Sequence, residues 1–227
     1  MTLNAIKQAI YGLYLTNSFG LRLKYTNDPM QKKHLRYAYS VAQLEALNIT
    51  IKVENKEKLP TKGQYLLVSN HRSIIDPPIL EVALRETSIF GSWISKKELY
   101  NSFFFGLFVR HAGSILLDRE KSQMSSFFAE IKETVASGDS IFIFPEGTRN
   151  KTEKLLLPFK DGSRIIAVKN RLDILPVYIK DNANEVLEKA LNNKNIHQEI
   201  HVVIGDRIPY KEKSNLEETY RKIFSLA

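Results

Sequence analysis

The stretch YLLVSNHRSIID, residues 65–76, decides the fold, because in it an apolar run ends directly in a polar motif. A second stretch of the same kind, IFIFPEGTR, occupies residues 141–149. Short apolar runs of this kind are typical of strands that are buried in a parallel sheet. Ligands of open α/β sheets gather at the C-terminal ends of such strands, so the two motifs are expected to form one site.

Strand and helix signals alternate along the chain from residue 49 onward. The expected strands cover residues 49–53, 64–69, 88–95, 112–117, 140–144, 173–179 and 199–204. The expected helices cover residues 77–86, 97–109, 121–137, 161–171, 183–193 and 214–226. This alternation predicts an α/β fold with a mostly parallel central sheet flanked by helices.

The N-terminal segment differs from the rest and is expected to be a two-helix hairpin. Apolar residues at helical spacing predict a helix over residues 3–24, and Asn27-Asp28-Pro29 is a turn signal. A second helix follows, with Tyr37, Val41 and Leu44 on one stripe. We therefore expect a helical hairpin over residues 1–48 and an α/β domain over residues 49–227.

Five of the eight net positive charges lie in the first 44 residues. Up to Leu44 the only acidic residue is Asp28, against six basic residues: Lys7, Arg22, Lys24, Lys32, Lys33 and Arg36. An apolar stripe beside cations is typical of a helix that lies in the interface of an anionic membrane. The same stripe could pack on the α/β domain, and the two roles are compatible.

The chain carries no signal for export or for crossing a membrane. No apolar run approaches the ~20 residues of a spanning helix, and the first residues lack the layout of a signal peptide. The absence of cysteine excludes disulfides and a cysteine nucleophile, and it fits a reducing compartment. We expect a peripheral or monotopic protein on the cytoplasmic face of the membrane.

His71 and Asp76, in the first motif, are the candidate catalytic pair. Histidine accepts a proton near neutral pH, and a carboxylate bonded to its second ring nitrogen fixes its tautomer and orientation. Such a pair can activate a substrate hydroxyl if the chain turns sharply after Ser69. Asp76 also precedes Pro77, so it could instead be only the N-cap of the next helix.

Cations near other strand ends indicate a phosphorylated substrate. Arg149 in the second motif can bind a phosphate in bidentate fashion, and Gly147 lets the backbone turn there. Glu146 could hold this arginine or accept a hydrogen bond from a substrate hydroxyl. Arg119 follows a further expected strand and is a second candidate phosphate ligand, and Lys97 lies at the end of the strand before it. The alternative for the second motif is a tight turn with a surface ion pair.

Several other functions lack their sequence signatures. There is no Gly-x-Ser-x-Gly elbow, no phosphate-binding loop of the nucleotide type and no dinucleotide fingerprint. The remaining histidines show no metal-ligand spacing, so neither a metal nor a bound cofactor is expected. The aromatic cluster at residues 103–108 is typical of a core, and alternatively it could line a tunnel for an acyl chain.

These motifs resemble those of the glycerophospholipid acyltransferase family, whose best-known members are the lysophosphatidic acid acyltransferases. Four family blocks occur in order: Asn-His-x4-Asp at 70–76, Lys-x-Glu-Leu at 96–99 with Asp-Arg at 118–119, Phe-Pro-Glu-Gly-Thr-Arg at 144–149, and an apolar strand with proline at 174–179. One block alone is a weak signal, whereas four in order are specific. The two N-terminal helices resemble the membrane-docking pair of bacterial members.

The resemblance implies an acyltransferase that makes phosphatidic acid in phospholipid synthesis. His71, oriented by Asp76, would deprotonate the free sn-2 hydroxyl of lysophosphatidic acid, which attacks the thioester of acyl-CoA or of acyl carrier protein. The resemblance assigns these residues to substrate binding: Asn70, Lys97, Arg119, Glu146, Gly147, Thr148 and Arg149. The expected partners are the anionic lipid surface, the lysophospholipid and the acyl donor, and no nucleic acid.

Two other interpretations stay open at this stage. The acceptor could be glycerol 3-phosphate or a lyso-aminolipid, although the arginines favour a phosphate. The chain could also be a non-catalytic basic protein that binds membranes or nucleic acid, but it has no signature of nucleic-acid recognition.

Overall fold

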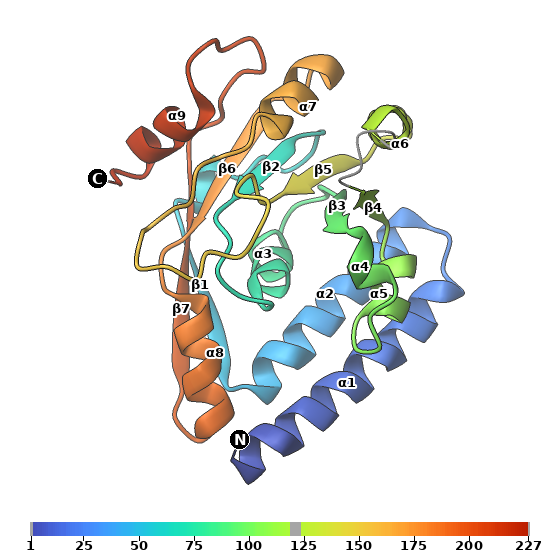
Figure 1. Ribbon diagram of the computed structural model, residues 1–227, viewed down its shortest axis with the longest axis vertical. Helices are drawn as coiled ribbons and strands as arrows, with labels where there is room; N and C mark the ends of the chain where they lie inside the picture. The colour runs from blue at the N-terminus through green and yellow to red at the C-terminus, as the bar shows by residue number, and fades with distance from the viewer. Residues whose placement is uncertain (1, 119–123, 227) are drawn as a thin grey trace.

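A seven-stranded sheet forms the centre of the computed structural model, which describes residues 2–118 and 124–226 (Figure 1). The strands are β1 (Ile49–Glu54), β2 (Leu66–Ser69), β3 (Gly91–Lys96), β4 (Ser114–Leu117), β5 (Ser140–Ile143), β6 (Ile174–Ile179) and β7 (Gln198–Ile204). Their order is β1-β7-β6-β2-β5-β3-β4, and every neighbouring pair is parallel except the antiparallel pair β6–β7. The expected α/β fold with a mostly parallel sheet is confirmed.

Helices cover both faces of this sheet. They are α1 (Leu3–Lys24), α2 (Pro29–Ala46), α3 (Asp76–Ala83), α4 (Lys97–Tyr100), α5 (Gly106–His111), α6 (Met124–Ala136), α7 (Gly162–Asn170), α8 (Ala183–Asn192) and α9 (Leu216–Ile223), with a 3-10 turn at Lys56–Lys58. One apolar core joins α3 and α8 to one face, and a second core joins α6, α7 and α9 to the other. β2 lies between these cores, and its Leu66, Leu67 and Val68 are fully buried. The alternating pattern of the sequence therefore produces three layers with β2 at the centre.

The expected N-terminal hairpin is also confirmed as a structure. The Asp28 side chain accepts a hydrogen bond from the backbone of Gln31 and caps α2, and Pro29 occupies its first turn. α1 packs along α2 and α5 (Figure 1). At Gly20 an added Cβ would lie 2.8 Å from the backbone nitrogen of Phe108, so only glycine allows this close approach of α1 to α5. No helix of the described residues is both long and apolar enough to cross a membrane.

One expected helix, over residues 97–109, is wrong. The structure has two short helices there, α4 and α5, separated by residues 101–105. The Ser102 hydroxyl accepts a hydrogen bond from the backbone of Phe105, and the Gly106 N–H donates to the Ser102 carbonyl. The first bond is the contact of an N-cap residue and the second is a helical one, so a new helical turn starts at Ser102 and α4 does not continue into α5. The expected helix over 121–137 begins outside the described residues and is observed from Met124 to Ala136.

Candidate active site

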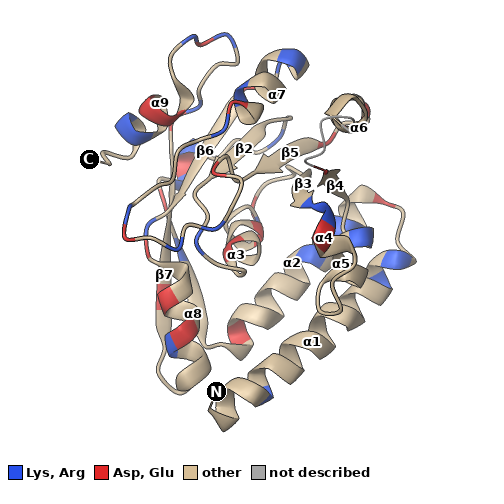
Figure 2. Ribbon diagram, in the orientation of Figure 1, with Lys and Arg blue, Asp and Glu red and all other residues tan. Residues whose placement is uncertain are grey.

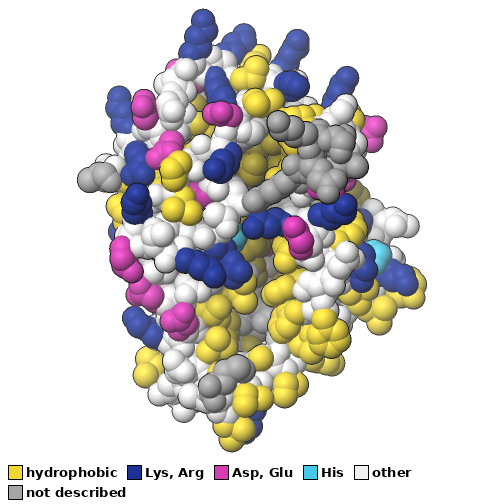
Figure 3. Space-filling view, in the orientation of Figure 1, with side chains coloured by type: hydrophobic (Ala, Val, Ile, Leu, Met, Phe, Trp, Pro, Cys, Tyr) yellow, Lys and Arg dark blue, Asp and Glu magenta, His cyan; other side chains and the backbone are white. Residues whose placement is uncertain are grey.

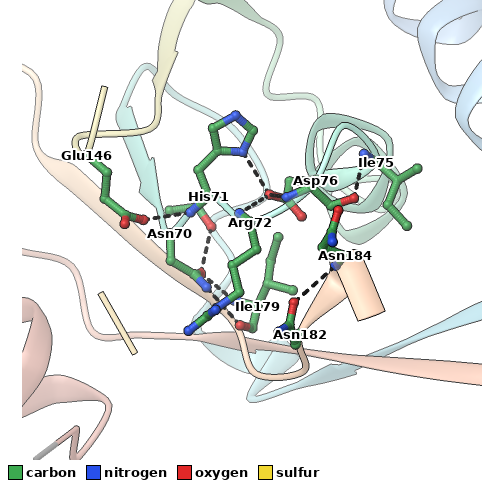
Figure 4. A network of polar contacts seen from close by, with 11 residues as sticks. Asn70, His71, Arg72, Ile75, Asp76, Glu146, Ile179, Asn182 and Asn184 are labelled. Atoms are coloured by element: carbon green, nitrogen blue, oxygen red, sulfur yellow. Dashed lines mark hydrogen bonds and ion pairs between the residues drawn. The ribbon is translucent and has the colours of Figure 1, made fainter. Parts of the chain in front are cut away.

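The two motifs meet because their strands are neighbours in the sheet. β2 pairs in parallel with β5 on one side and with β6 on the other, so the C-terminal ends of all three strands lie together. The chain turns directly after Ser69, and it turns again after Phe144. The shared edge expected from the apolar runs is therefore present, and it holds residues 70–76 beside residues 145–150 (Figure 4).

Asn70 fixes the start of the first turn. Its amide donates to the carbonyl of Ile179 at 3.0 Å and accepts from the N–H of Ile179 at 2.8 Å. The side chain thus continues the hydrogen bonding of the sheet beyond the end of β2, and Asn70 is only 2% exposed. We conclude that Asn70, which was expected among the substrate ligands, holds the turn against β6.

His71 and Asp76 form the expected pair. His71 Nδ1 lies 2.8 Å from Asp76 Oδ2, and the same oxygen accepts the backbone N–H groups of Arg72 at 2.6 Å and Ser73 at 2.8 Å. Because Oδ2 accepts these two bonds it carries no proton, so the Nδ1 of His71 must be the donor. The lone pair of the neutral ring is then on Nε2, which has no hydrogen-bond partner among the described residues. The His71 side chain is 18% exposed, so this nitrogen is the basic atom of the site.

The alternative role of Asp76 as a helix cap is partly correct. Asp76 is itself the first residue of α3, and its N-cap, Ile75, makes no side-chain cap bond. The carboxylate instead accepts a hydrogen bond from the N–H of Ser73, three residues earlier, and this bond is one of the two that form a capping box. One buried carboxylate oxygen therefore both closes the turn and orients His71, so the two roles do not exclude each other.

The second motif holds the backbone of His71 from both sides. Glu146 Oε1 accepts the N–H of His71 at 2.7 Å, and the carbonyl of His71 accepts the N–H of Asn150 at 2.7 Å. The other oxygen, Oε2, accepts the N–H of Leu157 at 2.8 Å. Glu146 is 2% exposed, and this burial raises its pKa, against the opposing effect of the bonds from Leu157 and His71. Glu146 thus braces the turn that carries His71, and among the bonds of the described residues none joins it to Arg149, which one of its two expected roles required.

Glu146 and Asp76 lie on opposite sides of His71 (Figure 4). One carboxylate fixes the backbone of the histidine and the other fixes its ring. This arrangement restrains the ring position without using Nε2, as a general base requires.

The His71 ring also rests on an aromatic platform that the sequence did not reveal. The ring of Phe144 stacks on it with centroids 4.0 Å apart and planes 10° apart. Trp93 of β3 stacks in turn on Phe144 with centroids 5.1 Å apart. Phe144 is the first residue of the third block, and this position was the only indication in the sequence that it belongs to the site.

Arg72 was also missed, although it lies inside the first motif. Its guanidinium donates to the carbonyls of Thr152, Lys154 and Leu155. Arg72 therefore holds the loop that follows the second motif against the turn that carries His71, and it does so through main-chain atoms that have no sequence signature.

Gly147 confirms the expected turn. Its φ of +68° lies in the left-handed region, which other residues adopt only with strain. Thr148 and Arg149 follow on the surface and are exposed. The turn therefore displays a guanidinium toward solvent at the same edge of the sheet as His71.

Lys97 lies at the end of β3, and its Nζ is 2.6 Å from Oδ2 of Asp118, which follows β4. Since β3 and β4 are parallel neighbours, this ion pair lies at the same sheet edge. The Lys97 side chain is 60% exposed. Arg119, the other expected phosphate ligand, lies outside the described residues.

Comparison with known proteins identifies the family. The family described as Acyltransferase matches residues 50–180, more than half of the 227 residues, so the chain belongs to this family. The Helicobacter pylori protein named 1-acyl-sn-glycerol-3-phosphate acyltransferase is 41% identical over 128 residues, 55% of this chain and 53% of that protein. A Bacillus subtilis protein of the same name is 27% identical over 165 residues, 72% of this chain and 80% of that protein.

A Saccharomyces cerevisiae protein of that name is 30% identical over 175 residues, 70% of this chain and 54% of that protein. The match thus spans about half the length of the yeast and Helicobacter relatives. The crystal structure of the 1-acyl-sn-glycerophosphate acyltransferase PlsC from Thermotoga maritima has a TM-score of 0.70 at 20% identity. It covers 97% of this chain and 92% of its own, so the fold is shared along nearly the whole length. The family expected from the four blocks is confirmed.

Proposed function

We propose that this protein transfers a fatty acyl group from a thioester to the sn-2 hydroxyl of lysophosphatidic acid and so produces phosphatidic acid for phospholipid synthesis. The observation that carries the proposal is the His71–Asp76 pair, whose 2.8 Å bond directs the basic Nε2 away from the carboxylate. The names of the Helicobacter, yeast and Bacillus relatives support the choice of acceptor.

The reaction follows from this pair. Nε2 of His71 takes the proton of the acceptor hydroxyl as its oxygen attacks the thioester carbonyl, and Asp76 stabilises the imidazolium that forms. The C–S bond of the tetrahedral intermediate then breaks, and the imidazolium returns the proton to the departing thiolate. One C–O bond replaces one C–S bond, and no acyl-enzyme forms.

The cations at the sheet edge would hold the phosphate of the acceptor. Arg149 can bind it in bidentate fashion, and Thr148 and the backbone at Gly147 lie in the same turn. Lys97 and Arg119 would add positive charge from the neighbouring strands. Glu146 and Asn70 would contribute indirectly, by keeping His71 in place.

Acyl-CoA and acyl carrier protein are both acyl donors that this chemistry can use. Both are anionic, and the chain has a net charge of +8, so charge does not distinguish them. We also propose that the protein needs neither a metal nor a bound cofactor, because His71 can carry out both proton transfers of the reaction.

The hairpin over residues 1–48 is proposed to dock on the lipid surface beside the catalytic part, residues 49–227. One face of α1 packs inward, whereas the other exposes large apolar side chains: Leu3, Ile6, Ile10, Tyr11, Tyr14 and Leu21. Ile10 is 64% and Tyr14 65% exposed. Hydrophobic side chains gather over α1, and Lys and Arg residues gather where α1 meets α2 (Figures 2 and 3). These features are those of a helix in the interface of an anionic membrane, and we place the protein on the cytoplasmic face.

A hollow on the same face of the molecule would receive the acyl chain. It runs between α8 and the helices α1, α4 and α5, with hydrophobic side chains along its sides (Figure 3). Phe103 lies between α4 and α5 and is 86% exposed, so part of the aromatic cluster is not in the core. An acyl chain could therefore pass from the membrane along α1 to the site.

The proposal is tested by measuring thiol release from acyl-CoA with a thiol reagent and a panel of acceptors. The protein has no cysteine and so gives no background of its own. We expect release that depends on lysophosphatidic acid and is lost in His71→Ala. Equal release by both proteins without an acceptor would contradict acyl transfer. Release with glycerol 3-phosphate or a lyso-aminolipid alone would contradict the proposed acceptor. If acyl-CoA gives no release, the assay is repeated with acyl carrier protein as donor, and no release with either donor would contradict acyl transfer.

A further inference from the structure

A continuous series of side-chain contacts connects the N-terminal hairpin to the His71 ring. The series runs from α2 through α3 and β3 to the end of β5, and its members are Arg36, Glu81, Trp93, Phe144 and His71. The motifs of the sequence do not include the first three of these residues.

Arg36 begins the series as a buried cation. It is 2% exposed, and its guanidinium forms an ion pair with Glu81 through Nε, at 3.0 Å, and through Nη2. Its Nη1 donates to the carbonyls of Gly91 at 2.7 Å and Ala112 at 3.3 Å. All of these partners belong to the α/β part of the chain, so Arg36 fastens α2 to it.

Glu81 connects Arg36 to Trp93 through a single carboxylate oxygen. Its Oε1 accepts from Arg36 and also from Nε1–H of Trp93 at 2.8 Å. Because Trp93 stacks on Phe144 and Phe144 stacks on His71, this oxygen helps to fix the platform of the catalytic ring. Glu81 also lies on α3, whose first residue is Asp76, so the ion pair restrains both members of the catalytic pair.

We propose that Arg36 is a positioning residue for the acyl transfer, acting through Glu81 and Trp93 on the His71 ring. The proposal rests on the proposed function, and it makes the hairpin a part of the catalytic machinery as well as a membrane anchor. If Arg36 is removed, Glu81 keeps a buried charge without its partner and must move toward water. Trp93 then loses its acceptor, and the aromatic rings beneath His71 are free to shift.

Lys33 provides a matched control on the same helix. It is also buried, at 7% exposed, and it donates to the carbonyls of Thr87 and Ile89, at 2.9 Å for the latter. It has no hydrogen bond to Glu81 or Trp93 among the described residues. Lys33→Met therefore loosens the attachment of α2 to the α/β part and removes only a through-space charge interaction with Glu81, whereas Arg36→Met breaks the series of contacts.

The experiment compares Arg36→Met, Lys33→Met and Trp93→Phe with wild type. The acceptor is presented in detergent micelles, so that membrane docking does not limit the rate. The geometry is read by NMR of the full chain with 13C-labelled histidine, because ring protons that lie over the face of Phe144 are shifted upfield. There are five histidines, and the His71 signal is the one that is absent in His71→Gln.

We expect Arg36→Met to lose the upfield shift of His71 and to lower kcat by about 10-fold or more, with KM changed less than about twofold. Trp93→Phe keeps an aromatic ring but lacks the Nε1–H, and it should shift the signal and lower kcat by about 3–10-fold. Lys33→Met should keep the shift and a kcat within about twofold of wild type. If Arg36→Met does not fold, the shift and the kcat of Trp93→Phe decide whether the series of contacts positions the His71 ring.

The proposal is overturned if folded Arg36→Met, or Trp93→Phe in its place, keeps both the shift and the wild-type kcat. It is also overturned if Lys33→Met lowers kcat and the upfield shift of His71 as much as Arg36→Met does. The loss in Arg36→Met would then come from the weaker attachment of α2 and not from the series of contacts. If wild type transfers no acyl group to any acceptor, the proposed function fails. The NMR comparison still decides in that case whether Arg36 positions the ring.

Discussion

Glu146→Gln tests whether the buried glutamate of the second motif braces His71 or contacts the acceptor. In the structure its two oxygens accept two different backbone N–H groups, from His71 at 2.7 Å and from Leu157 at 2.8 Å. Glutamine is nearly isosteric but has only one oxygen, so its NH2 group must face one of these donors. One buried N–H group then loses its acceptor.

The size of the effect follows from this loss. A buried donor without a partner costs about 1–3 kcal/mol, and removal of a buried charge offsets part of this. We expect a net loss of about 1–2 kcal/mol at neutral pH, which lowers the Tm of a chain of this size by about 2–8 °C.

The pH dependence has a definite sign. Burial raises the pKa of Glu146 above its ordinary value of 4.5, so its contribution to stability is fully present below pH 4.5 and is lost as pH rises through the higher value. Glutamine does not titrate. The difference in stability between wild type and Glu146→Gln should therefore be largest in acid and should narrow toward neutral pH.

Thermal unfolding between pH 4 and 8, together with acyl-transfer kinetics, measures these effects. Glu153→Gln is the control, because Glu153 lies in the same loop and is exposed. We expect Glu146→Gln to lower kcat and Tm with little change in the KM for lysophosphatidic acid. An unchanged Tm with a KM raised about 10-fold would refute the reasoning and would place Glu146 on the acceptor.

Three further predictions concern the pair, the phosphate and the membrane. Asp76→Asn should keep the fold, since asparagine can still accept from the backbone, but should lower kcat by about 10²–10⁴-fold because the imidazolium of His71 loses its counter-charge; a wild-type rate would end the catalytic role of Asp76. Arg149→Lys should raise the KM for lysophosphatidic acid by about 10-fold with kcat nearly unchanged, and equal KM values in a steady-state assay would remove this arginine from the phosphate site. Ile10→Asp should reduce sedimentation with anionic vesicles by about 10-fold or more, whereas Val168→Asp, an exposed position on α7, should not; equal binding would mean that α1 is not the anchor.

Features that depend on neighbouring residues were predictable from the sequence. The apolar runs gave the strands because side chains that are buried on both faces need an unbroken run of apolar residues. The His71–Asp76 pair was predictable because the two residues are only five positions apart, so a single turn of the chain brings them together. The break after Tyr100 was missed because a new helical turn starts at Ser102, whose hydroxyl accepts the backbone N–H of Phe105 as an N-cap residue does.

Features that depend on distant backbone atoms were not predictable. The family resemblance placed Asn70 and Glu146 among the substrate ligands. Their partners are main-chain groups 109 and 75 positions away, at Ile179 and His71. Every residue has such groups, so no sequence pattern indicates which of them a side chain will bind. The structure separates side chains that hold the site from those that can reach a substrate.

Bonds to distant backbone atoms also change the electrostatic attraction to membranes that the sequence predicts for the hairpin. Up to Leu44, six basic residues and one acidic residue give a charge of 6 − 1 = +5, but Lys33 and Arg36 are buried, which leaves 4 − 1 = +3 at the surface of that stretch. Each basic residue near an anionic surface contributes about 1 kcal/mol, and burial of one large apolar side chain contributes about 1.5–3 kcal/mol. The exposed apolar face of α1 should therefore dominate binding. We expect an increase from 0.1 to 0.5 M salt to weaken vesicle sedimentation less than Ile10→Asp does, and the opposite order would mean that charge is the main anchor.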